Sequence, residues 1–380
     1  MGARCPSGDR AGTEMEFRAA VLTTVGAPLS IERVTLGRLR PGDVLIRNRA
    51  SGLCHTDLEV IDGSLAYPLP IVLGHEGAGV VEAVGSAVTQ VKIGDHVVAS
   101  WNPHCGHCFY CERDLPILCE PFTREQPAGN LLDGASRLTW RGARLNHFSV
   151  VSSHAEYSVV PESGAIRVPH EIPFDRACLI GCGVMTGVGA VSRLARVEAG
   201  SSVVVVGCGA VGLNAIQAAA LAQAAVVIAI DLDPSKLALA THMRASHTLV
   251  ADESTLDAVR ALTAGRGADY VFEVAGTEAA LQLALEVTRP GGQLVILGKT
   301  AVNRMVNLRF GSMMGEKRIV RSSYGGARPR RDFPWLAQLY LDGKLDLDTL
   351  VSARLPLDHI NDGFAAMRRG EGIRHVVTFG

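Results

Sequence analysis

The sequence has little of several features that mark specialised classes of protein. Its 37 basic and 38 acidic residues leave a formal net charge of −1, which argues against a surface for nucleic acid. Apolar runs stay short of the ~20 residues that a membrane span requires, because glycines interrupt them, as Gly207 does after the run Val203–Val206. We therefore expect a protein that binds neither nucleic acid nor a membrane.

The chain also lacks an apolar secretion signal at its start, where residues 1–14 are rich in Gly, Arg, Ser and Thr. We expect these residues to form a disordered N-terminal extension, with Met15 as an alternative start. Without an export signal, the 9 cysteines imply a reducing compartment, in which thiols stay free or bind metal. The prediction is a cytoplasmic protein.

Aromatic residues make up only 5% of the chain, whereas 41 of its 380 residues are glycine, which is typical of an α/β enzyme packed through small side chains. From Phe17 to about Val168, short β-rich runs alternate with Gly and Pro, which predicts a small, partly antiparallel β domain. From about Ala199 to Pro329, strands and helices alternate, which predicts a parallel sheet with crossover helices. The tail beyond is expected to return to the first domain, after a solvated turn at 328–332.

Four cysteines form the most informative local motif. Their spacing lets the thiolates converge on one tetrahedral ion, and four thiolates leave no open position for chemistry. The motif therefore predicts a structural zinc site, although two disulfides or an iron–sulfur cluster use similar cysteines. The four are Cys105, Cys108, Cys111 and Cys119.

A glycine-rich turn predicts a dinucleotide site. It follows an apolar strand and opens a helix, so the helix N-terminus faces the phosphates. Asp231 ends the next apolar run, where a carboxylate accepts hydrogen bonds from the adenosine ribose and repels a 2′-phosphate. NAD is therefore favoured over NADP, against the simpler interpretation of a glycine-rich turn without a nucleotide. The turn reads Gly207-Cys208-Gly209-Ala210-Val211-Gly212.

A second, dispersed set of metal-ligand residues includes Cys54, His75 and Cys182. Two thiolates and one imidazole are three protein ligands, which leave a fourth position for water or substrate, as a catalytic zinc requires. Spacing alone does not establish this site, because a lone Cys or His more often packs in a core.

Together these motifs resemble the zinc-dependent medium-chain alcohol dehydrogenases, from horse-liver-type and class III-like enzymes to bacterial aryl-alcohol and thiol-dependent formaldehyde dehydrogenases. The resemblance runs from Met15 to Phe379 and includes Gly74-His75-Glu76-Gly77 and Gly181-Cys182-Gly183. It implies a GroES-like catalytic domain at 15–184, with the structural zinc lobe at 101–120. A Rossmann NAD-binding domain would follow at 185–325, with a return to the catalytic domain at 326–380.

The resemblance also implies roles for single residues. Cys54, His75 and Cys182 would hold the catalytic zinc, with Thr56 carrying the alcohol proton outward and Asp57 and Glu76 as carboxylates around the site. The family position that ends the proton relay holds Glu59 here instead of histidine. The cofactor contacts would be His55, Thr186, Gly207, Gly209, Val211, Gly212, Asp231, Lys236 and Arg374.

The expected reaction is NAD-dependent oxidation of a primary alcohol to an aldehyde, or the reverse. Zinc lowers the pKa of a bound hydroxyl to about 7, and the resulting alkoxide delivers hydride to the nicotinamide. Trp101 and Phe148 resemble pocket-lining aromatics, which favours an apolar or aromatic alcohol, with ordinary core packing as the alternative for either. Lys299 either pairs with an anionic substrate or extends its charge to solvent. The alternative is a thiol-adduct formaldehyde dehydrogenase, although the loop Val60–Leu69 lacks the acidic pair associated with glutathione recognition.

Two further points complete the expectations. The length of the stretch Cys119–Ser153 resembles dimeric members of the family, so we expect a homodimer, with a tetramer as the alternative. The rival functions are a polyol dehydrogenase on the same scaffold and a non-catalytic relative of the kind found among lens crystallins, since fold alone does not define function.

Overall fold

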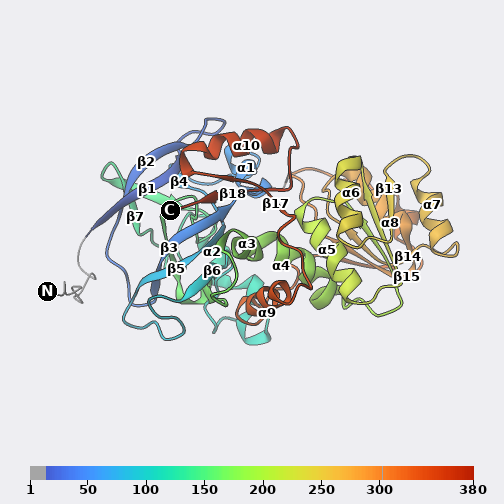
Figure 1. Ribbon diagram of the computed structural model, residues 1–380, viewed down its shortest axis with the longest axis horizontal. Helices are drawn as coiled ribbons and strands as arrows, with labels where there is room; N and C mark the ends of the chain where they lie inside the picture. Colours follow the sequence, from blue (N-terminus) through green and yellow to red (C-terminus); the bar gives the residue numbers. More distant parts are fainter. Residues whose placement is uncertain (1–13, 302) are drawn as a thin grey trace. The chain divides into compact units, whose positions relative to one another are not determined.

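The computed structural model describes residues 14–301 and 303–380. The expected N-terminal extension therefore lies outside the described residues, apart from Glu14. The chain forms two compact units, one of residues 1–181 and 351–380 and the other of residues 182–350 (Figure 1). The expected domain boundary at residue 326 thus lies inside the second unit.

The first unit is the expected β-rich domain, built from a closed barrel and a seven-stranded sheet. In the sheet β3 pairs antiparallel with β5 and with β18, so the last strand of the chain completes this unit. The barrel strands are β1 (Met15–Leu22), β2 (Ser30–Leu36), β7 (Leu138–Trp140), β8 (Ala143–His147) and β4 (Ile71–Val72). The sheet strands are β10 (Ala165–Arg167), β6 (His96–Ala99), β5 (Glu76–Val84), β3 (Asp43–Gly52), β18 (Arg374–Thr378), β17 (Val351–Leu355) and β9 (Tyr157–Pro161).

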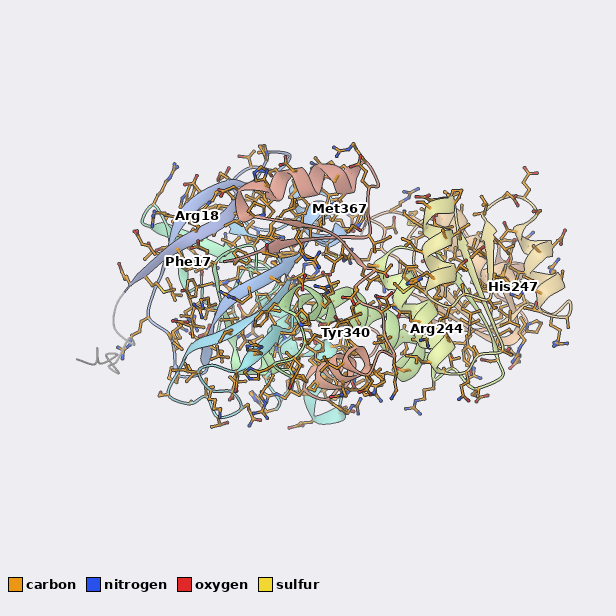
Figure 2. The ribbon with its side chains drawn as sticks, in the orientation of Figure 1. Phe17, Arg18, Arg244, His247, Tyr340 and Met367 are labelled. Carbon is orange, nitrogen blue, oxygen red and sulfur yellow. The ribbon has the colours of Figure 1, made fainter. Side chains whose placement is uncertain are left out.

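Alternating side chains on β1 show why this unit has a core. Figure 2 shows Phe17 and Arg18 at neighbouring positions, which point to opposite faces of a strand. Phe17 is 3% exposed and packs in a hydrophobic cluster, whereas Arg18 forms an exposed ion pair with Asp358. Short helices complete the unit: α1 (His55–Ile61), α2 (Glu120–Glu125), α3 (Phe174–Leu179) and α10 (Ile360–Arg368).

The second unit is a six-stranded parallel sheet with the strand order β13-β12-β11-β14-β15-β16. In chain order this is 3-2-1-4-5-6, the arrangement of a dinucleotide-binding sheet, and its order reverses between β11 and β14. The strands are β11 (Ser202–Val206), β12 (Val226–Asp231), β13 (His247–Val250), β14 (Ala268–Glu273), β15 (Thr288–Ile296) and β16 (Arg318–Arg321). The helices are α4 (Met185–Gly189), α5 (Ala210–Leu221), α6 (Pro234–His242), α7 (Thr255–Leu262), α8 (Glu278–Val287) and α9 (Pro329–Leu341).

We expected no apolar segment long enough to span a membrane. The helical segment Phe174–Ala195 differs, since its 22 residues suffice by length and composition alone to cross one. However, 78% of its apolar window is buried inside the protein, as in a core helix. Its middle, Ile180–Val184, is a π-helical turn, a distortion that often occurs at functional sites. This turn carries Cys182.

We expected the charged stretch at 328–332 to be a solvated turn. This expectation was wrong, because the stretch forms the start of α9. Asp332 is fully buried and accepts hydrogen bonds from the Arg328 backbone N–H at 2.7 Å and the Arg331 Nε at 3.0 Å. Arg193 adds an ion pair at 3.0 Å. The carboxylate therefore compensates both the helix N-terminus and its basic neighbours.

Candidate metal centre and nucleotide site

The first candidate centre gathers Cys54, His75, Glu76 and Cys182, which each offer one ligand atom within 4.8 Å of the others. Cys54 caps the N-terminus of α1, His75 directly precedes β5, and Cys182 lies in the π-helical turn. Segments far apart in the sequence therefore meet at one point. Two thiolates, one imidazole and a carboxylate form a donor set suited to zinc.

Asp57 ties this group together from behind. It is fully buried on α1, and its Oδ2 accepts the Cys54 backbone N–H at 3.1 Å. Its Oδ1 accepts the Gly74 backbone N–H at 3.0 Å and lies 3.2 Å from His75 Nδ1. A carboxylate on Nδ1 orients the imidazole and leaves Nε2 available to a metal.

Glu76 and Arg374 form the buried polar edge of the group. Arg374 Nη2 donates to Glu76 Oε1 at 3.4 Å and to Cys54 Sγ at 3.7 Å. Glu76 Oε2 is buried without a hydrogen-bond partner among the described residues. Burial raises the pKa of Glu76 to about 7, although the Arg374 charge opposes the shift. A cation at this point would satisfy the orphaned oxygen, so the residues fit a bound zinc.

The expected relay residues lie along α1. Thr56 and Glu59 are half-buried and His55 is exposed. Their expected roles in proton transfer and cofactor binding remain predictions.

The two expected pocket aromatics differ in their surroundings. The Phe148 ring is fully buried and meets the His75 ring edge-to-face, with centroids 5.6 Å apart. Trp101 is half-buried, and its ring lies 6.2 Å from that of Phe122 in a hydrophobic cluster. Sequence reasoning missed Tyr67, whose ring lies 5.0 Å from Phe148. No local motif announces this tyrosine, because only the fold brings it to the aromatic group.

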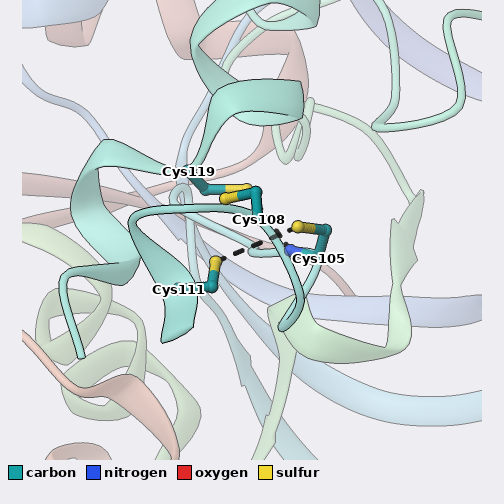
Figure 3. A group of neighbouring side chains, drawn as sticks. All are labelled: Cys105, Cys108, Cys111 and Cys119. Atoms are coloured by element: carbon teal, nitrogen blue, oxygen red, sulfur yellow. Dashed lines mark hydrogen bonds between the residues drawn. The ribbon is translucent and has the colours of Figure 1, made fainter. Parts of the chain in front are cut away.

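The second candidate centre is the four-cysteine lobe, whose sulfurs lie within 4.8 Å of one another (Figure 3). The Sγ atoms of Cys105 and Cys111 are 3.9 Å apart, close to the about 3.8 Å that four Zn–S bonds of tetrahedral geometry imply. Backbone N–H groups of Cys105 and Glu120 donate to the sulfurs of Cys119 and Cys108. The described cysteines form no disulfide, so the disulfide alternative fails here.

The glycine-rich turn has the geometry that a dinucleotide requires. Gly207 has a φ of +101°, and a Cβ on Gly212 would lie 1.9 Å from the Gly207 carbonyl oxygen. A Cβ on Gly209, by contrast, would meet no heavy atom within 4 Å. The first and third glycines thus permit the turn and the close packing of α5, while the second leaves bare backbone for a ligand.

Asp231 closes this site at the end of β12. Its Oδ2 accepts the Cys208 backbone N–H at 2.6 Å, and its Oδ1 accepts the Asp233 N–H at 2.9 Å. The carboxylate is thus held at the carboxyl edge of the sheet, where the ribose of a dinucleotide binds in this fold. These residues fit NAD.

The other expected cofactor residues are spread over the second unit. Thr186 is 6% exposed on α4, and Val211 and Lys236 are half-buried on α5 and α6. Lys299 is exposed shortly after β15. Its backbone lies close to Gly276, since a Cβ added to Gly276 would lie 2.3 Å from the Lys299 carbonyl oxygen. Their contacts with a cofactor or substrate remain predictions.

Comparison with known proteins agrees with this geometry. Residues 40–170 match the alcohol dehydrogenase GroES-like domain, and residues 210–342 match the zinc-binding dehydrogenase domain. The S-(hydroxymethyl)glutathione dehydrogenase of Paracoccus denitrificans is 37% identical over 375 residues, which cover 96% of this chain and 100% of the relative.

Two solved structures share the complete fold. An alcohol dehydrogenase zinc-binding domain protein from Burkholderia ambifaria superposes with a TM-score of 0.92 at 37% identity, covering 97% of this chain and 100% of that one. The benzyl alcohol dehydrogenase of Acinetobacter calcoaceticus gives a TM-score of 0.91 at 31% identity, covering 96% and 100%. With its two metal-ligand groups and its nucleotide turn, the chain belongs to the zinc-dependent medium-chain alcohol dehydrogenase family, an oxidoreductase family that uses zinc and NAD.

Proposed function

We propose that this protein oxidises the hydroxymethyl group of an S-(hydroxymethyl) thiol adduct with NAD, or catalyses the reverse reaction. Such an adduct is a primary alcohol, so its oxidation needs no chemistry beyond that of an alcohol dehydrogenase. Several full-length curated relatives bear the name S-(hydroxymethyl)glutathione dehydrogenase, and this carries the proposal. From the sequence alone, an apolar or aromatic alcohol was the expected substrate and this adduct the alternative.

Cys54, His75 and Cys182 would hold the catalytic zinc, with Glu76 within reach of the same point, as their spacing of at most 4.8 Å supports. Zinc with an open position acts as a Lewis acid, which polarises an oxygen and makes its proton more acidic. The four cysteines of the lobe would hold the second, structural ion.

The remaining chemistry falls to the protein's own side chains. Asp57 would fix the tautomer of His75, since its Oδ1 lies 3.2 Å from His75 Nδ1. Thr56 would accept the substrate proton at its hydroxyl and pass it to solvent or to Glu59. Thr56 and Glu59 both lie on α1. On the cofactor, Asp231 would bind the adenosine ribose and the bare backbone at Gly209 the pyrophosphate.

The thiol of the adduct need not be glutathione. The loop Val60–Leu69 carries a single acidic residue, Asp62, and this carboxylate is already ion-paired with Arg368. A different low-molecular-weight thiol, such as mycothiol, would place fewer cationic groups against this loop.

A primary aromatic alcohol is the second candidate. The edge-to-face packing of His75, Phe148 and Tyr67 places aromatic rings beside the proposed zinc ligand, and the half-buried Tyr67 is the one that would meet an apolar substrate ring. The structural similarity to a benzyl alcohol dehydrogenase supports the same substrate class.

One assay separates these candidates. NADH formation at 340 nm is followed with formaldehyde mixed with glutathione or mycothiol, with benzyl alcohols and with longer primary alcohols. A kcat/KM at least tenfold higher for one thiol adduct supports the first proposal, and a preference for benzyl alcohol supports the second. Activity with none of them, or fewer than two zinc ions per chain, would contradict the proposed function.

We further propose a cytoplasmic homodimer. β16 forms one edge of the parallel sheet and exposes Ile319 (41%), and the segment before it exposes Phe310 (72%) and Met314 (60%). Apolar side chains along an open edge support pairing of two such sheets about a twofold axis. Light scattering at the mass of four subunits would overturn the dimer.

A further inference from the structure

His154 is a buried histidine that the expected reaction does not use. Its side chain is fully buried, and its backbone N–H donates to the Leu73 carbonyl at 3.0 Å. The Ser153 N–H donates to the Gly74 carbonyl at 2.9 Å. The segment that carries His154 is therefore held against the two residues that lead directly into His75.

The ring of His154 has one engaged nitrogen and one that is not. Its Nδ1 lies 2.9 Å from the Ser51 hydroxyl, which itself lies 2.7 Å from the Ser153 hydroxyl. Its Nε2 is buried without a hydrogen-bond partner among the described residues, and it lies 3.8 Å from Asp57 Oδ1. If Nε2 carries the ring hydrogen, a buried unpaired N–H is costly, and Asp57 Oδ1 is an acceptor close enough to relieve that cost.

Gly74 makes this approach possible. Gly74 has a φ of +94°, and a Cβ there would lie 2.7 Å from His154 Nδ1 and 2.5 Å from the His154 backbone nitrogen. The ring also meets Phe364 edge-to-face, with centroids 5.9 Å apart. The imidazole is thus confined by a bare glycine and an aromatic ring, with its Nε2 3.8 Å from Asp57 Oδ1.

We propose that His154 is a positioning residue of the catalytic zinc, acting through Asp57. When Ser51 donates its hydroxyl hydrogen to Nδ1, the ring hydrogen resides on Nε2 and faces Asp57 Oδ1. Asp57 then holds two imidazoles, His154 on one side and His75 on the other, while it also binds the Cys54 N–H. His154 thereby restricts the carboxylate that aims the His75 ring at the metal. This proposal rests on the zinc assignment made above.

The test replaces His154 by phenylalanine, which keeps a ring against Phe364 but removes both nitrogens. The measured quantity is the rate at which a colorimetric chelator removes each zinc ion at a fixed temperature. We expect the catalytic zinc to leave about 10- to 100-fold faster, in line with the effect of partners behind metal ligands. The zinc of the four-cysteine lobe should leave at the wild-type rate, which makes it an internal reference.

Two further variants distinguish positioning from general packing. His154→Gln keeps a donor and should restore part of the slow release. His147→Phe replaces a second fully buried histidine of the same unit and should leave catalytic-zinc release unchanged per folded molecule. The cobalt-substituted protein adds a spectroscopic readout, because its visible absorption bands should shift in His154→Phe but not in His147→Phe.

Ser51→Ala tests the same link if His154→Phe does not fold. It removes the hydroxyl partner of Nδ1 and should accelerate catalytic-zinc release in the same direction. Wild-type release and an unchanged cobalt spectrum in either variant would overturn the proposal, as would an equal acceleration at both zinc sites. A wild-type protein that holds only the lobe zinc would instead remove the zinc assignment itself, and the two failures are therefore distinguishable.

Discussion

Replacing single glycines of the nucleotide turn by alanine should separate cofactor binding from folding. At Gly209 a Cβ meets no heavy atom within 4 Å, and the φ of −74° is open to any residue. The loss of a favourable N-cap glycine and the stiffer unfolded chain roughly offset each other. We therefore expect Gly209→Ala to change the free energy of unfolding by less than about 1 kcal/mol.

The same substitution should, by contrast, weaken cofactor binding strongly. The added methyl group occupies the backbone surface that the pyrophosphate approaches, so the affinity for NADH should fall about 10- to 100-fold, or about 1.4 to 2.7 kcal/mol. Gly212→Ala is the matched control, because its Cβ would lie 1.9 Å from the Gly207 carbonyl oxygen, which is backbone and does not rotate away. Overpacking of this kind costs about 3 kcal/mol, which corresponds to about 6 to 12 °C in melting temperature.

The assay combines NADH fluorescence titration with thermal unfolding of the cofactor-free protein. The expected pattern is a stable Gly209→Ala that binds weakly and a Gly212→Ala that melts early. Wild-type affinity in Gly209→Ala would refute the placement of the pyrophosphate at this turn. A wild-type melting temperature in Gly212→Ala would refute the close packing of α5 on the turn.

Three further predictions concern other parts of the protein. Cys119→Ser should lower the metal content from two zinc ions per chain to one, because Cys119 is fully buried in the lobe; elemental analysis that still finds two would contradict a four-thiolate site. Burial, with help from the charges of Arg137 and Arg144, lowers the pKa of His147 to about 3, so the unfolded chain binds this proton first as the pH falls below about 6.5. The free energy of unfolding that comes from neutral His147 is therefore fully present above about pH 6.5 and is lost as the pH falls towards 3, by about 2 kcal/mol between pH 6.5 and 5. Urea unfolding of His147→Gln should accordingly depend less on pH than that of the wild type. Asp231→Ser should weaken NAD binding about tenfold or more and improve the use of NADP, since a carboxylate that repels a 2′-phosphate is removed; an unchanged NAD/NADP ratio of kcat/KM would exclude this role.

Much of the fold follows from local patterns in the sequence. The valine run Ser202–Val206 is buried along most of its length and forms the strand that its composition predicts, and the glycine-rich turn opens α5 as expected. Such features depend on neighbouring residues, so composition and spacing suffice. The local prediction for the charged stretch at 328–332 was wrong, because the buried Asp332 pairs with Arg193, which lies far away in the chain.

By itself, the sequence determined the two kinds of domain, the nucleotide turn and the four-cysteine lobe, because the residues of each motif are neighbours along the chain. The resemblance to a known family named Cys54, His75 and Cys182 as ligands, but only the tertiary structure brings these distant side chains to one point, together with Glu76. Cys182 joins Cys54 and His75 through a π-helical turn, and Tyr67 and His154 reach the group without any local motif. Contacts between residues so far apart depend on how whole strands and helices pack, and no short stretch of sequence encodes that packing.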